Sequence, residues 1–114
     1  MTHDRQKNIR ILDELTSYCY LKGAEHISIN LDVDNDLITF TLKCYVPNIT
    51  KNDIDYLETS LNVPRCHEME EYYWELTGDT EGENELSLVG MMIDSVDIIL
   101  EEDILVIEVK RKNN

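Results

Sequence analysis

The stretch that decides the fold runs over residues 26–46 and reads HISINLDVDNDLITFTLKCYV. Apolar residues occupy alternate positions on both sides of the polar triplet at 34–36. Strict alternation is typical of a strand with one buried face, and two such strands around a three-residue turn form a β-hairpin. The side chains expected on the buried face of this hairpin include Ile29, Leu31, Phe40 and Leu42.

A second hairpin is predicted over 95–110, with its turn at 101–103. Apolar residues alternate again on both sides of this turn, and Ile98 and Ile107 are expected to be buried. The basic tail at 110–114 follows the last apolar residue and is expected to fray.

Four helices are predicted around the two hairpins. Residues 4–22 carry apolar side chains at spacings of three and four, and Gly23 marks their end. Thr2 or Asp4 is the expected cap of this first helix. A second helix begins at a capping box formed by Thr50 and Asp53 and ends near Asn62. The other two helices are expected at about 65–77 and 85–93, separated by a polar loop at 79–84.

The predicted order is therefore helix, hairpin, three helices, hairpin, or αββαααββ. Each strand has one apolar face and each helix one apolar stripe, so the two kinds of element can bury each other. The expected fold class is α+β: a two-layer sandwich in which a mostly antiparallel sheet of two hairpins has helices on one face. The length of 114 residues and the absence of a linker favour a single domain over 1–114.

Charge is distributed very unevenly. The chain has 24 acidic and 10 basic residues, a net charge of −14, and the segment between Cys66 and Val109 holds fourteen acids and no Lys or Arg. This balance argues against nucleic acid and anionic membranes as partners. The acidic half is expected to be either a solvated surface or a docking surface for a basic protein partner. The oligomeric state stays open, and a homodimer is one alternative.

The helix over 65–77 provides the candidate interaction residues. Its carboxylates Glu68, Glu71 and Glu75 are expected to be exposed, because no basic side chain lies near them in the sequence. The aromatic run at 72–74 cannot turn all its rings toward one core. Tyr73 or Trp74 is therefore either the edge of the packing or an anchor in a protein interface.

Metal binding and disulfides find little support. His67 and Glu71 lie four residues apart beside Cys66, but no second pair at ligand spacing accompanies them, so a solvated polar face is the favoured interpretation. Cys19 and Cys44 fall on apolar patterns and are expected in the core. Three cysteines without a CxxC pattern indicate reduced thiols and a cytoplasmic protein.

Motifs of catalysis and phosphate binding are missing. The sequence holds no GxSxG, no GxxxxGK and no GxGxxG, and its three histidines are scattered. We therefore expect no catalytic residues and no cofactor, and a non-catalytic regulatory or interaction domain. The alternative is a small-ligand-binding domain or an enzyme with an unrecognised site.

Three segments resemble the histidine-kinase-like ATPase domains, in particular the small anti-sigma-factor kinases of bacteria. Residues 13–29 are similar to the first helix and strand of that family, 86–96 to its late helix and following strand, and 106–111 to its closing strand. The resemblance implies an anti-sigma-like or signalling adaptor.

The nucleotide motifs of that family are replaced. Ser17 stands where the family has its magnesium-binding Asn, and 43–48 lacks the family's DxGxG loop. Glu81, Glu83 and Glu85 surround the place of its glycine-rich loop. The resemblance therefore implies a degenerate member that does not bind ATP.

Overall fold

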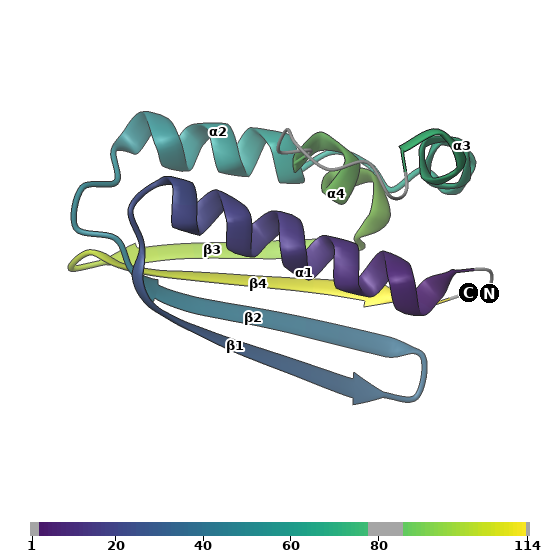
Figure 1. The fold of residues 1–114 in the computed structure, drawn as a ribbon, viewed down its shortest axis with the longest axis horizontal. Coiled ribbons are helices and arrows are strands. Elements are labelled where there is room, and N and C mark those ends of the chain that lie inside the picture. Colours follow the sequence, from purple (N-terminus) through teal and green to yellow (C-terminus); the bar gives the residue numbers. More distant parts are fainter. Residues whose placement is uncertain (1–2, 78–85, 114) are drawn as a thin grey trace.

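The structure, a computed structural model, describes residues 3–77 and 86–113, without the side chains of 73–77 (Figure 1). The predicted loop at 79–84 and Thr2 lie outside the described residues. The helices are α1 (Asp4–Leu21), α2 (Lys51–Leu61), α3 (His67–Thr77) and α4 (Leu86–Met92). The strands are β1 (Glu25–Asp34), β2 (Leu37–Tyr45), β3 (Ser95–Glu101) and β4 (Ile104–Lys112).

The sheet confirms the predicted fold class. Its strands follow the order β1-β2-β4-β3, and every neighbouring pair is antiparallel. The two hairpins thus join through β2 and β4 into one sheet, and the helices lie on one side of it (Figure 1). β1 and β3 are the two edge strands.

Local signals explain where two of the helices begin or end. The backbone amide of Asp53 donates to the Thr50 hydroxyl over 3.1 Å, and the Asp53 carboxylate accepts from the Thr50 amide over 3.0 Å, so the predicted capping box is present. Gly23 follows α1 with a φ of 87°, a conformation that glycine adopts without strain. Asp4 lies inside α1 instead of capping it, because His3 is the N-cap and makes no side-chain cap.

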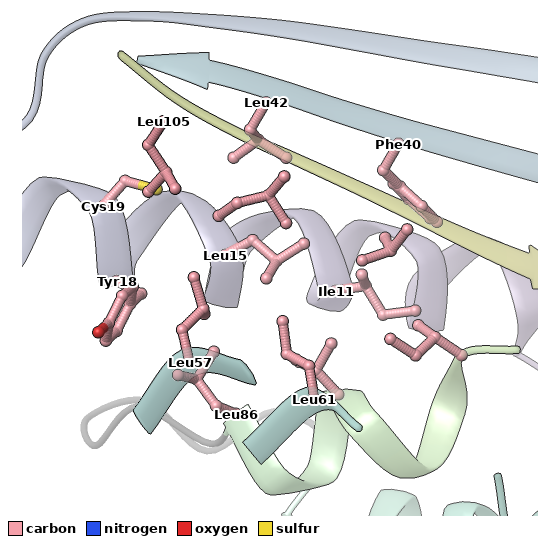
Figure 2. Packing of buried hydrophobic residues seen from close by; sticks show 14 of the residues in the cluster. Ile11, Leu15, Tyr18, Cys19, Phe40, Leu42, Leu57, Leu61, Leu86 and Leu105 are labelled. Atoms are coloured by element: carbon pink, nitrogen blue, oxygen red, sulfur yellow. The ribbon is translucent and has the colours of Figure 1, made fainter. Parts of the chain in front are cut away.

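The core lies between the sheet and helices α1, α2 and α4. Figure 2 shows Ile11 and Leu15 of α1 among side chains from the sheet and from α2. Cys19 and Cys44 are buried, as predicted. Other fully buried members of this core include Phe40, Leu42, Leu57, Leu61, Leu105 and Ile107.

The predicted burial of β1 is wrong. Ile29 and Leu31 stand opposite Leu42 and Phe40, so they share the face that points toward the helices. They nevertheless remain 45% and 42% exposed, and Val33 further along the strand is 68% exposed. The turn end of the β1–β2 hairpin runs away from α1 in Figure 1, so none of the described helices covers this part of the edge strand.

Two other predictions at the sheet need correction. Ile98 on the opposite edge strand β3 is half-buried instead of buried. The tail does not fray at residue 110, because β4 continues to Lys112 in register with β2. Arg111 in this segment is completely buried.

Helix α4 approaches α2 so closely that Gly90 is required at their contact. A Cβ atom added to Gly90 would lie 2.5 Å from the Ser60 carbonyl oxygen and 2.7 Å from Cγ2 of Val63. We expect Gly90→Ala to lower the free energy of unfolding by about 1–3 kcal/mol through overpacking. Urea unfolding followed by circular dichroism measures the change.

The matched control for this prediction is Ser87→Ala, an exposed position on the same helix. Its effect should stay within about 0.5 kcal/mol. Equal stability of Gly90→Ala and the parent would show that the α2–α4 contact is not tight.

Candidate functional site

The Glu70 carboxylate of α3 lies at the centre of a buried ion cluster. Its Oε2 atom accepts from Lys7 Nζ of α1 and from the guanidinium of Arg111 on β4, both over 3.0 Å. Lys7 and Arg111 are 0% exposed and Glu70 is 3% exposed. Burying these charges is tolerable only because they compensate one another.

Further bonds extend the cluster to both ends of the chain. Arg111 donates over 2.8 Å to Asp4 near the start of α1 and over 2.8 Å to the Met92 carbonyl at the end of α4. Lys7 also binds the carboxylate of Glu71. The cluster therefore joins α1, α3, α4 and β4.

Arg65, just before α3, adds a further cation to the cluster. Its NH1 atom donates over 2.8 Å to Asp94 and over 2.7 Å to the Lys112 carbonyl. Its NH2 atom lies 3.4 Å from Oε1 of Glu70. Asp94 in turn accepts from the Lys112 amide over 2.6 Å, so the end of β4 is held from two directions.

Two carboxylates of the cluster, Glu70 and Asp4, are stabilised in their charged form. Burial alone would raise the pKa of Glu70, but hydrogen bonds and charge from Arg111 and Lys7 outweigh it and lower the pKa. The pKa of Asp4 is lowered in the same way: burial opposes the shift, and the bond from Arg111 contributes to it. Glu70 and Asp4 are therefore ionised at neutral pH.

Helix α3 is thus not a freely solvated acidic face. Glu68 is exposed, as predicted, and Glu71 is exposed but paired with Lys7. Tyr72 is 58% exposed. The side chains of Tyr73, Trp74 and Glu75 lie outside the described residues, so docking on this helix stays a prediction.

The weak metal candidates are not assembled into a site. Glu71 is occupied by Lys7, and Cys66 precedes the helix that carries His67. Across residues 3–77 and 86–113, no three His, Cys, Asp or Glu side chains gather closely enough to hold a metal ion.

The clearest candidate surface is the apolar face of β1 formed by Ile29, Leu31 and Val33, which we call the β1 apolar face. These side chains repeat every second residue, so they form one continuous row along the edge strand. Val33 is the most exposed of the three side chains. The sequence pattern identified this row but could not show that it lies at an edge beyond the helix layer.

The outer face of the sheet carries a cavity of about 710 Å³. Its wall consists of Lys43, Ile99, Glu101, Glu102, Ile104 and Val106. These residues include three aliphatic side chains, two carboxylates and one cation, with no Ser, Cys or His. The cavity could hold a small molecule, and its wall carries no hydroxyl, thiol or imidazole group.

Cys19 and Cys44 meet in the core between α1 and β2. A hydrogen bond with Cys44, together with burial, raises the pKa of the Cys19 thiol. The same hydrogen bond lowers the pKa of the Cys44 thiol, against the effect of burial. A buried thiol of raised pKa is a poor nucleophile, so Cys19 is not suited to catalysis.

None of the helices within the described ranges is long and apolar enough to cross a membrane.

No protein-family model matches the chain, and no curated protein sequence matches it.

Removing the charge of Glu70 should destabilise the fold. The Glu70→Gln variant keeps the shape of the side chain but leaves Lys7 and Arg111 without their shared buried counter-charge. We expect a loss of about 3 kcal/mol in the free energy of unfolding, measured by urea titration at neutral pH. Glu68→Gln, at an exposed position of the same helix, should change stability by less than about 0.5 kcal/mol. Equal effects of the two substitutions would contradict a structural role for the cluster.

The stability difference between the parent and Glu70→Gln should depend on pH. Because the folded state lowers the pKa of Glu70 from its ordinary 4.5, the stabilisation is complete above that value and is lost as pH falls through the folded pKa. Urea titrations of both proteins at steps from about pH 7 to about pH 3 should therefore show a shrinking difference. A difference that stays constant would mean that Glu70 is not ionised in the folded protein.

Proposed function

We propose that this chain is a non-catalytic regulatory domain of the cytoplasm that binds a protein partner. The observation that carries the proposal is the β1 apolar face, a row of aliphatic side chains left open at a sheet edge. Exposed apolar rows on edge strands invite association, and proteins normally shield them with charged side chains, especially Lys, with Pro, or with a covering element. β1 has neither Lys nor Pro.

The arrangement of the elements supports the proposal indirectly. The order αββαααββ is similar to that of the histidine-kinase-like ATPase domains. The residues that would hold magnesium and nucleotide in that family are replaced in this chain. A degenerate, protein-binding member of that class is consistent with both observations, and we retain the expectation that it does not bind ATP.

Small-ligand binding is the second candidate function. The volume of the outer-face cavity falls within the range of about 300–1,000 Å³ typical of ligand pockets. Glu101 and Glu102 line this cavity together with Lys43, so an anionic ligand would meet repulsion as well as attraction. This cavity therefore supports the alternative less well than the β1 apolar face supports protein binding.

The test compares three forms of the protein as bait in an extract of the native host. The double variant Leu31→Ser/Val33→Ser removes the β1 apolar face, and Ile99→Ser/Leu100→Ser removes two exposed aliphatic side chains from the other edge strand. We expect the parent and the β3 variant to capture the same protein, and the β1 variant to capture roughly tenfold less of it by quantitative mass spectrometry. Circular dichroism must show that all three forms are folded. Capture that depends on β3, or on neither strand, would refute binding through β1.

A further inference from the structure

The free edge of β1 is built as a regular template for a further strand. Its pairing with β2 is irregular only between Glu25 and Ser28, where His26 has a φ of 59°. From Ser28 to Asp34 every residue has one partner on β2, so the backbone there is evenly extended. A regular edge without a bulge presents unpaired amides and carbonyls to an incoming chain.

The two faces of this segment differ in chemistry. Toward the helices it offers the β1 apolar face, and on the opposite face it offers Asp32 and Asp34. Asp32 accepts a hydrogen bond from Asn30 over 2.9 Å, and Asp34 lies 3.4 Å from the Asn35 amide group. Within the described part of the chain, neither carboxylate forms an ion pair.

The neighbouring strand does not neutralise these carboxylates. Asp32 stands opposite Thr39 and Asp34 opposite Leu37. The only cation in β2 is Lys43, which pairs with Ser28 at the far end of the regular segment. A partner strand can therefore supply positive charge that β2 lacks.

We infer that β1 binds an extended segment of a basic partner protein, in which Lys or Arg alternates with aliphatic residues, as an added strand of the sheet. This inference rests on the proposed function and specifies the chemistry of the partner. The aliphatic residues of the segment would extend the row of Ile29, Leu31 and Val33, and its cations would face Asp32 and Asp34. Main-chain hydrogen bonds provide affinity in this mode of binding, and alternate side chains provide specificity.

Charge also selects between this occupant and a second copy of the chain. Each copy carries a net charge of −14, so two copies repel each other over a long range. A second β1 strand would bring two more carboxylates to the same edge instead of cations. A basic segment of another protein is attracted at long range by the net negative charge of the chain, and at contact by Asp32 and Asp34.

The probe is a synthetic peptide of about eight residues in which Lys and Val alternate, since strands are commonly of this length. A block peptide of the same composition, with all Lys residues before all Val residues, has the same charge without the alternation. We expect the alternating peptide to bind roughly tenfold more tightly in a fluorescence anisotropy titration at physiological salt. Amide hydrogen exchange should become slower at Ser28–Asp34 and remain unchanged on β3.

Protein variants test the charge complementarity. Asp32→Asn/Asp34→Asn should weaken binding of the alternating peptide several-fold and reduce its salt dependence. Asp97→Asn/Glu101→Gln, which removes two carboxylates from β3, should leave binding unchanged. Equal affinity for both peptides, protection on β3, or unchanged binding by the Asp32/Asp34 variant would overturn the inference.

Failure of this inference can be distinguished from failure of the proposed function. If the host extract yields a protein whose capture requires Leu31 and Val33 but the alternating peptide does not bind, protein binding stands and the added basic strand is refuted. Sedimentation that shows a dimer of the parent, absent in Leu31→Ser/Val33→Ser, would assign the edge to a second copy and would overturn the inference as well.

Discussion

The carboxylate of Glu70 is the constraint on which the arrangement of the chain depends. It is buried between Lys7 and Arg111, which lie 63 residues before it and 41 residues after it. A buried charge of either sign without its partner would be costly, so the three residues must come together or none can be buried. Their meeting fixes α3 relative to α1 and β4. The bond from Arg111 to Asp4 also holds the two ends of the chain side by side, as Figure 1 shows.

The same cluster uses part of the negative charge of this protein in ion pairs within the fold. The acidic half has no basic residues of its own, yet Lys7, Arg65 and Arg111 come from outside it and pair with Glu70, Glu71 and Asp94. Part of the acidic helix is therefore committed to structure. Asp32 and Asp34, by contrast, have no ion-pair partner among the described residues. Carboxylates available to a partner are thus present on β1 as well.

The helix layer determines which edge of the sheet is open. On β3, the inward-facing Val96 and Ile98 are half-buried and pack against the core. On β1, only Ile27 near its start packs there, and Val33 near the turn is the most exposed because the hairpin diverges from α1 toward its turn, as Figure 1 shows. A monomer gains nothing from such a row of exposed aliphatic side chains, whereas a partner that covers it removes apolar area from water. Protein binding at this edge is the function that this geometry supports best.

The sequence by itself determined the elements of this protein, because hydrophobic periodicity and capping are local signals. Alternation at 26–46 predicted the first hairpin, and Thr50 with Asp53 predicted the start of α2. It could not determine which strand lies at an edge, since Ile29 and Phe40 have the same pattern but differ completely in burial. It also could not show that Arg111 in a basic tail reaches Glu70, because ion pairing across 41 residues depends on the packed fold. Only the tertiary structure decided these two features, and they define the cluster that orders the chain and the face that remains open.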